Sequence, residues 1–140
     1  MISEPVHLLD TSIIVNLLRR RPSQVIANRV RPLIAASRAA FNDVVRAELV
    51  VGCKTDAEIR LVHEWLAGLS ALRVREGTWE NAEMLGFALR RKGVTASLPD
   101  LLIASSAIEH GAVVMHVDGD FDTIALHSDL RIESYAEAQI

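Results

Sequence analysis

The stretch from His7 to Leu17 limits the possible folds more than any other part of the sequence. It opens with a short apolar run that suits a buried strand, and this run ends at Asp10. Apolar residues then recur at helical spacing, with Thr11 or Ser12 available to cap the helix at its N-terminus. The pattern predicts a strand that leads directly into a helix, with Asp10 at the carboxyl end of the strand.

The position of Asp10 has two interpretations. In an open α/β sheet, ligands bind beside the carboxyl ends of the strands, where loops converge and the N-termini of helices point. An isolated acid in front of a helix is equally typical of an ordinary helix cap. The rest of the chain therefore has to decide between a site residue and a cap.

Further strands and helices are expected to alternate along the chain. Apolar runs and turn residues place the strands at residues 39–41, 72–74, 112–117 and 131–133. Capping residues and helical spacing place helices at residues 22–31, 43–52, 55–68, 78–93, 100–111 and 124–126. This alternation predicts an α/β fold.

Composition limits the class of protein. With 140 residues, 50% of them hydrophobic, and no internal repeat, the chain is expected to form one domain over residues 1–140. It lacks both a long uncharged apolar run and a secretory leader, so we expect a cytoplasmic protein with no membrane span. Cys53 is the only cysteine, which excludes an intrachain disulfide. A net charge of -3 gives no overall attraction for nucleic acid, so any such binding needs a local patch.

Four places in the sequence put a carboxylate beside an apolar run. Asp10 follows the first strand, Asp100 lies in the first turn of a helix, and Asp118 with Asp120 follows a late strand. Glu48 lies inside an apolar helix and is expected to face the core, where it needs a partner. Three of these places would meet at one edge of the sheet.

Such a gathering of acids is unfavourable without a cation. Two carboxylates within about 4 Å repel by roughly 4 kcal/mol at an effective dielectric constant of 20. A cluster of them is stable only if it is protonated or holds a cation, and oxygen ligands suit Mg²⁺ or Mn²⁺. A metal held in this way is suited to hydrolysis of phosphodiester bonds.

Four motifs in this order resemble PIN-domain ribonucleases, and specifically the VapC toxins of type II toxin-antitoxin systems. The motifs are Leu8-Leu9-Asp10-Thr11-Ser12, Glu48-Leu49-Val50-Val51-Gly52, Pro99-Asp100-Leu101-Leu102-Ile103-Ala104 and His116-Val117-Asp118-Gly119-Asp120-Phe121. The resemblance covers nearly the whole chain. It implies a three-layer α/β domain whose central, mainly parallel sheet is flanked by helices.

The resemblance also implies an activity and its site. A Mg²⁺-dependent endoribonuclease, in which Mn²⁺ can substitute, would use Asp10, Glu48, Asp100 and Asp118 as catalytic metal ligands. Asp120 is either a further ligand or the cap of the helix that Phe121 starts. Thr11 and Ser12 are expected to support the site by hydrogen bonds to a ligand or to a metal-bound water. The implied partners are an RNA substrate, a VapB-type antitoxin that blocks the acidic groove, and a second copy of the chain in a homodimer.

Several alternatives remain at this point. The chain could be a PIN-like module that binds RNA or protein without catalysis, although a binding module has no need to bear the repulsion of intact carboxylates. His116 stands where such proteins often have Thr or Ser, and it is either a core residue or a general base. Other phosphate-handling enzymes fit poorly, because Ser12 replaces the second acid of a haloacid-dehalogenase motif and no glycine-rich loop is present.

Overall fold

A parallel sheet forms the centre of the molecule. The computed structural model describes residues 4–136, and these form a five-stranded sheet with the order β3-β2-β1-β4-β5, in which all neighbouring strands are parallel. The strands are β1 (His7–Leu9), β2 (Ala39–Asn42), β3 (Ser70–Leu72), β4 (Val113–His116) and β5 (Arg131–Ser134).

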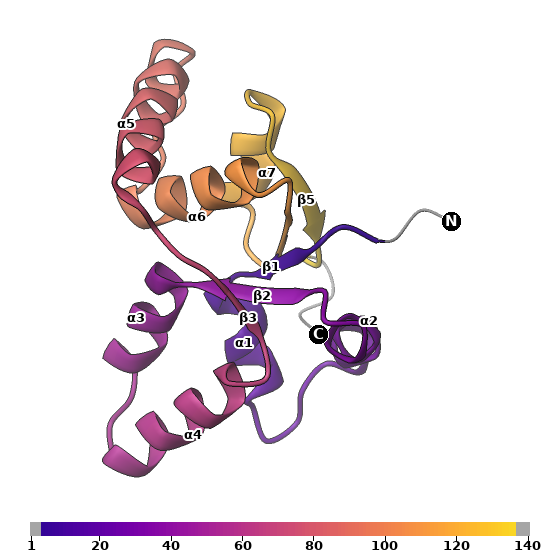
Figure 1. Ribbon diagram of the computed structural model, residues 1–140. Helices are drawn as coiled ribbons and strands as arrows, with labels where there is room; N and C mark the ends of the chain where they lie inside the picture. The colour runs from indigo at the N-terminus through magenta and orange to yellow at the C-terminus, as the bar shows by residue number, and fades with distance from the viewer. Residues whose placement is uncertain (1–3, 137–140) are drawn as a thin grey trace.

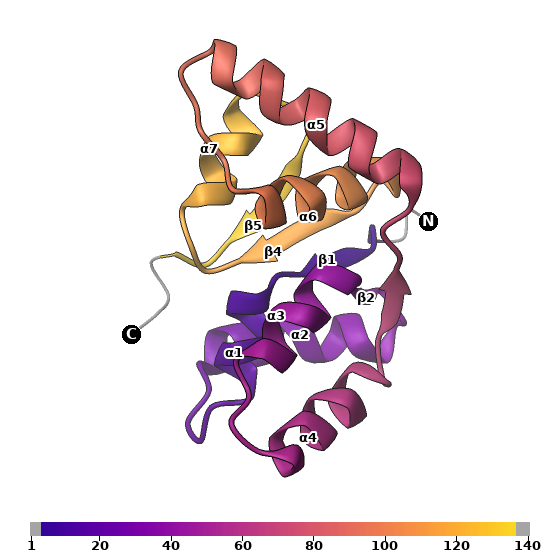
Figure 2. The same ribbon diagram turned by 90° about the vertical axis from the view of Figure 1, so that its left-hand side faces the viewer.

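Helices cover both faces of this sheet, so the molecule has three layers. They are α1 (Thr11–Leu17), α2 (Gln24–Ala35), α3 (Asp43–Val51), α4 (Asp56–Leu66), α5 (Glu76–Arg91), α6 (Leu98–Glu109) and α7 (Asp120–Leu126). Figure 1 shows α1 to α4 on one side of the sheet and α5 to α7 on the other, and Figure 2 shows the same layers after a quarter turn. The predicted three-layer α/β fold is confirmed.

The central strand β1 is the point at which the strand order reverses. Leu8 pairs with Ala40 of β2 on one side and with Val114 of β4 on the other. Helices cover β1 and β4 on both faces, so all their residues are buried, and apart from His7 and His116 these residues are apolar without alternation. In open α/β sheets the crevice beside such a reversal, at the carboxyl ends of the strands, is the usual ligand site.

Some element boundaries differ from the predicted ones. The third strand ends at Leu72 and does not reach Val74, whose N–H instead donates to Asp43. Helix α5 begins at Glu76 rather than Thr78, because the Thr78 hydroxyl accepts from the Arg75 N–H and so caps the helix from inside its first turn. Helix α2 continues to Ala35, beyond the predicted end at residue 31.

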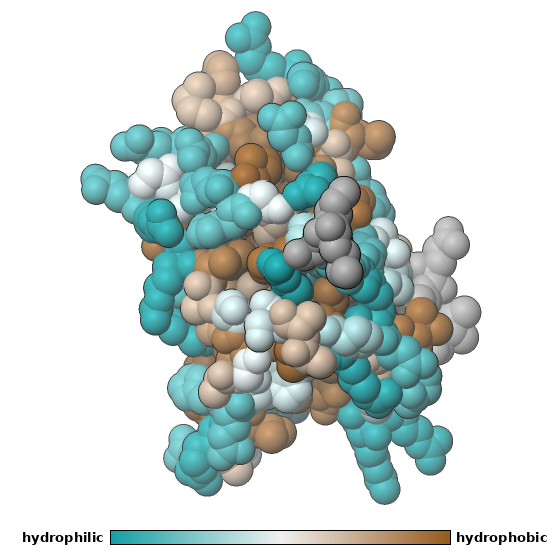
Figure 3. Space-filling view, turned by 45° about the vertical axis from the view of Figure 1, so that its right-hand side comes forward, coloured by the Kyte–Doolittle hydropathy of each residue, from teal (hydrophilic) through white to brown (hydrophobic). Residues whose placement is uncertain are grey.

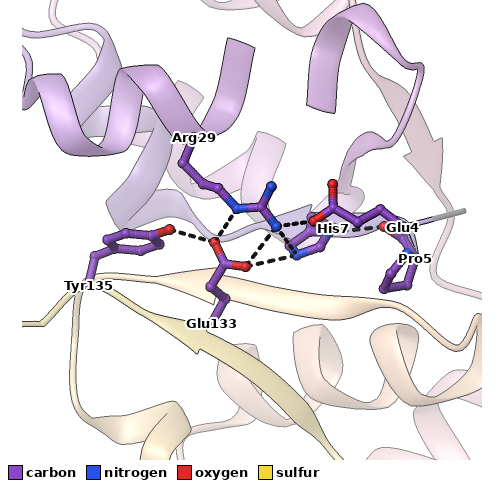
Figure 4. Close-up of polar contacts among 6 residues, drawn as sticks. All are labelled: Glu4, Pro5, His7, Arg29, Glu133 and Tyr135. Carbon is purple, nitrogen blue, oxygen red and sulfur yellow. Dashed lines mark hydrogen bonds and ion pairs between the residues drawn. The ribbon is translucent and has the colours of Figure 1, made fainter. Parts of the chain in front are cut away.

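A polar cluster joins the N-terminal segment, α2 and β5, and we call it the Glu133 cluster (Figure 4). It consists of Glu4, His7, Arg29, Glu133 and Tyr135. Arg29 donates to Glu133 through Nε at 2.8 Å and through Nη2 at 2.9 Å, and it also contacts Glu4. The Tyr135 hydroxyl donates to Glu133 at 2.6 Å, and His7 Nε2 lies 3.2 Å from the same carboxylate.

The carboxylate of Glu133 is held in its charged form. Burial alone would raise its pKa, but the hydrogen bonds from Arg29 and Tyr135 outweigh burial and lower the pKa to about 2. The same cluster raises the pKa of Tyr135 to about 12, chiefly by burial and by the hydrogen bond to Glu133. The cluster therefore fastens the edge strand β5 to α2.

Removal of the guanidinium should loosen this attachment. We expect Arg29→Met to lower the free energy of unfolding by about 1–2 kcal/mol at pH 7, because Glu133 stays partly buried without its charged partner. A depressed pKa stabilises the fold above the unfolded value of 4.5, and this stabilisation is lost as pH falls toward about 2. The difference from wild type in urea denaturation should therefore narrow over that range. Arg31→Met on the same helix is the control, since Arg31 is exposed and bonds only Asn28.

The surface is mainly hydrophilic at its two ends. Figure 3 shows hydrophilic side chains projecting at the top and the bottom of the molecule, with hydrophobic side chains between them in smaller areas. Within residues 4–136, no helix is both long enough and apolar enough to cross a membrane.

Candidate metal and nuclease site

Two of the predicted acids lie at the carboxyl ends of neighbouring strands. Asp10 directly follows β1, and Asp118 follows β4 by two residues. Leu9 and Met115 pair in the sheet, and the Asp10 N–H donates to the Met115 carbonyl at 3.0 Å. The two acids therefore flank the crevice at the reversal of strand order.

Asp10 is both a helix cap and a buried acid. Its side chain accepts from the Ser12 N–H at 3.2 Å, so Asp10 itself is the N-cap of α1. Of the caps that the sequence leaves open, Asp10 is confirmed and Thr11 and Ser12 are not. The backbone of Asp10 is extended and the helix begins at Thr11, so Thr11 and Ser12 lie inside the first turn rather than at the cap position. Asp10 is only 4% exposed, and burial raises its pKa although the hydrogen bonds from Ser12 oppose the rise.

Ser12 connects the two strand ends. Its hydroxyl donates to Asp10 Oδ2 at 2.7 Å and accepts from the Val117 N–H at 3.0 Å. One side chain thus fixes the carboxylate after β1 relative to the backbone that leads into Asp118. The expected supporting position of Ser12 agrees with these contacts, while its bond to a metal-bound water stays a prediction.

Helix α6 brings Asp100 to the same edge. Ser97 caps the helix by accepting from the Asp100 N–H at 3.3 Å, and Pro99 occupies the first turn, where its missing N–H is harmless. Gly86 of α5 lets that helix approach α6 closely, because a Cβ at position 86 would lie 2.8 Å from a methyl group of Leu101. Burial, followed by repulsion from Asp10 and Asp118, raises the pKa of Asp100 to about 6. The three acids are therefore close enough to act on one another.

The turn after β4 adds a fourth carboxylate. Asp118 Oδ1 accepts from the Asp120 N–H at 2.7 Å, which closes a tight turn before α7. The interpretation of Asp120 as the helix cap was wrong, because α7 begins at Asp120 and Gly119 is its N-cap. The exposed Asp120 contributes to the repulsion that raises the pKa of Asp100.

Glu48 lies apart from these acids. It is exposed on α3, so the expectation that it faces the core was wrong. The buried face of α3 is formed by Val45 and Leu49, which places Glu48 on the open side of the helix. Its carboxylate accepts from the Thr11 hydroxyl at 2.8 Å, and this contact links it to the residue after Asp10. Glu48 therefore stands at the rim of the site rather than in its centre.

His116 and Asp122 form a pair behind the acids. His116 is fully buried at the end of β4, packs against the ring of Phe121, and has Nε2 3.2 Å from Asp122 Oδ1. The core interpretation of His116 therefore agrees with its position. Sequence reasoning missed Asp122, although acids at every second position from Asp118 were a visible signal. The cap of α3 is Asn42, a fully buried residue and one of the two caps, Asn42 or Asp43, that the sequence offers for this helix.

The donors suit a hard cation in their chemistry. All the acids named above offer oxygen ligands, and burial together with repulsion disfavours the charged forms of Asp10 and Asp100 unless a cation offsets it. As the side chains lie, no three His, Cys, Asp or Glu residues within positions 4–136 converge on a point that would hold a metal ion. The carboxylate chemistry and the raised pKa values of Asp10 and Asp100 nevertheless fit a site for a hard cation.

The sequence is similar to those of known proteins. The family model of the PIN domain matches residues 7–126. Ribonuclease VapC11 of Mycobacterium tuberculosis is 35% identical over 132 residues, which is 91% of this chain and 98% of that protein. Ribonuclease VapC51 of the same organism is 33% identical over 125 residues, with 85% of each chain covered.

Solved structures show the same fold. VapBC-1 from nontypeable Haemophilus influenzae matches with a TM-score of 0.76 at 25% identity, covering 94% of this chain and 98% of that one. DNA-bound VapBC from Salmonella typhimurium matches with a TM-score of 0.79 at 21% identity, covering 94% of this chain and 99% of that one.

Proposed function

The chain belongs to the PIN-domain family, and on that premise we propose that it is the toxin of a type II toxin-antitoxin system and hydrolyses RNA phosphodiester bonds as a Mg²⁺- or Mn²⁺-dependent endoribonuclease. The likeness to two ribonucleases named VapC, each over most of its length, supports this activity. We propose further that residues 1–140 form one PIN domain.

One observation carries the proposal. Asp10, Asp100 and Asp118 approach one another at the reversal of strand order, closely enough that their repulsion helps raise the pKa of Asp100 to about 6. A fold gains no stability from gathering like charges in a partly buried place, since each pair repels. A bound divalent cation would turn this repulsion into attraction, and such a cation is what phosphodiester hydrolysis needs.

Each acid has a proposed role. Asp10, Asp100 and Asp118 would hold the cation, Glu48 would complete the set from the rim, and Asp120 is a further candidate ligand. When bound, the cation would polarise a phosphoryl oxygen and lower the pKa of a coordinated water.

The contacts of the chain itself keep these acids in place. Ser12 holds Asp10 by its 2.7 Å hydrogen bond, and the Asp120 N–H holds Asp118. Thr11 keeps the carboxylate of Glu48 turned toward the start of α1. These side chains orient the carboxylates before substrate arrives, which reduces the reorganisation that the reaction requires.

Cleavage of end-labelled RNA tests the proposal directly. We expect cleavage with Mg²⁺ or Mn²⁺ and none when EDTA is present, with products resolved on a denaturing gel. The alternative is a PIN-like module that binds RNA or protein without catalysis. Binding of the RNA with no cleavage in either metal would favour that alternative and contradict ours.

We propose three partners for this function. RNA is the substrate, a VapB-type antitoxin blocks the acidic groove, and a second copy of the chain forms a homodimer in the cytoplasm. The solved VapBC structures support the antitoxin. Large exposed apolar side chains support the second copy, since such side chains mark association surfaces: Val51, Trp79, Met84 and Phe87.

A further inference from the structure

Two basic runs flank the acidic site. Arg19-Arg20-Arg21 and Arg90-Arg91-Lys92 are the only places in the 140 residues where three basic residues stand in succession. The first run forms the turn after α1, and the second ends α5. Each run therefore lies close in sequence to an element that carries an acid of the site, since α1 follows Asp10 and the loop after α5 leads to Asp100.

The six side chains are exposed, and none of them has a carboxylate partner within the described part of the chain. Arg91 lies over the ring of Phe87, and Lys92 donates to the His127 carbonyl at 3.3 Å. Arg29, by contrast, is tied to two carboxylates. The charges of the two runs are therefore available to an external anion.

A groove reaches the first run, and a cavity at the site adjoins the loop that follows the second run. A groove of about 430 Å³ extends from Thr11 and Glu48 to Arg19. A smaller polar cavity of about 120 Å³ is lined by Asp100 and Asp120 and by residues 94–97, the loop that follows the second run. Figure 2 shows the turn after α1 at the lower left and the loop after α5 at the upper left, on the side toward which β4 points.

We propose that a single RNA strand crosses the acidic site between these two runs and that their side chains bind its phosphates on both sides of the scissile bond. The inference rests on the proposed ribonuclease function and adds the path of the substrate. A net charge of -3 and a centre of carboxylates repel RNA, so affinity has to come from local cations. Arginine suits this task because its planar group can contact phosphate oxygens in pairs.

The distances fit a short strand. The seven residues of α1 rise by about 10 Å, so the first run lies roughly this far from the acid that precedes the helix. A strand of several nucleotides can bridge such a distance. The competing explanation is that these cations only solvate helix ends and complement the dipole of α5. Under that explanation, replacing these basic side chains leaves the affinity for RNA unchanged.

RNA binding separates the two explanations. We measure it by the fluorescence anisotropy of a fluorescein-labelled, unstructured RNA of about 12 nucleotides, in EDTA and at a series of salt concentrations. We compare wild type with the triple variants Arg19→Gln/Arg20→Gln/Arg21→Gln and Arg90→Gln/Arg91→Gln/Lys92→Gln. Each lost phosphate contact should reduce the slope of log K against log salt by about 0.7, so each triple variant should lose about 2 units of slope.

The control is Arg31→Gln/Arg38→Gln/Arg131→Gln, which removes the same charge near the amino ends of the strands, away from the site. Equal slopes for this control and for both triple variants would overturn the inference. Loss of binding to a protein partner with unchanged RNA affinity would overturn it as well. The first run lies outside the helices, so its variant remains informative if changes at the end of α5 disturb folding. Absence of any Mg²⁺-dependent cleavage by wild type would instead be the failure of the proposed function.

Discussion

Asp100→Asn and Asp10→Asn should each lower metal-dependent RNA cleavage by about a hundredfold or more. Each replacement is nearly isosteric but removes one unit of negative charge from the proposed cation site, and a hundredfold loss corresponds to about 2.7 kcal/mol of transition-state stabilisation. Glu48→Gln should lose less, because Glu48 is exposed at the rim and already hydrogen-bonded to Thr11. Initial rates of cleavage at saturating Mg²⁺, with far-UV circular dichroism as a check of folding, measure these effects.

The matched control for this series is Asp129→Asn. Asp129 is an exposed acid in the loop between α7 and β5, at the opposite edge of the sheet from the site. Its replacement removes the same charge and should leave the rate unchanged. If Asp10→Asn and Asp100→Asn cleave RNA as fast as the control, the assignment of the site is wrong.

The second large effect concerns stability and needs no RNA. We expect Mn²⁺ at about 100 times its dissociation constant to add about 2.7 kcal/mol to wild type. For a domain of this size this corresponds to an increase in Tm of about 8 °C. Asp100→Asn should gain little, because it lacks one proposed ligand. Thermal melts followed by circular dichroism at a fixed protein concentration give both values.

Without metal, Asp100→Asn should have a higher Tm than wild type. Burial and repulsion raise the pKa of Asp100 from 3.8 to about 6, so the native state takes up this proton more readily than the unfolded chain. Stability therefore decreases as pH rises between these values, and at pH 7 the penalty is fully present. Discounted for the partial exposure of Asp100 to solvent, it is about 1 kcal/mol. Asp100→Asn in EDTA should then melt about 3 °C above wild type at pH 7 and lose this advantage near pH 4.

These melts can contradict the proposal in two ways. Wild type that shows no shift at saturating Mn²⁺ would mean that the carboxylates share no cation. A variant that gains as much from Mn²⁺ as wild type would mean that the cation binds elsewhere. The Tm of Asp129→Asn should equal that of wild type in both buffers, since Asp129 is not among the charges that raise the pKa of Asp100.

The alternation of strands and helices and the places of three acids were predictable from the sequence because they depend on local patterns, whereas the three layers were implied by the resemblance to PIN domains. An apolar run followed by an acid and a helical pattern is enough to put Asp10 at a strand end, and the same reasoning applies to Asp118. Pro99 marks the start of α6 and so places Asp100 in the first turn. The assembly of these acids followed from parallel strands, whose carboxyl ends share one edge.

Features that depend on side-chain direction or on distant partners were not predictable. Glu48 was expected to face the core, since a helix of nine mostly apolar residues does not reveal which side is covered. The capping of α1 by Asp10 was left open because Asp, Thr and Ser are all good caps. The Glu133 cluster joins residues 104 positions apart, and no local pattern announces the pairing of Arg29 with Glu133.

The bond between Ser12 and Val117 spans 105 residues, and this separation has a consequence for biosynthesis. Asp10 leaves the ribosome early, but its neighbour Asp118 can join it only after β4 has been made and has paired with β1. At about 5–20 residues per second, the nascent chain spends several seconds with only the first of these acids exposed. Chains that stop before β4 therefore lack the pair of Asp10 and Asp118, and the capacity to cleave RNA would arise only after this late part of the chain has been made.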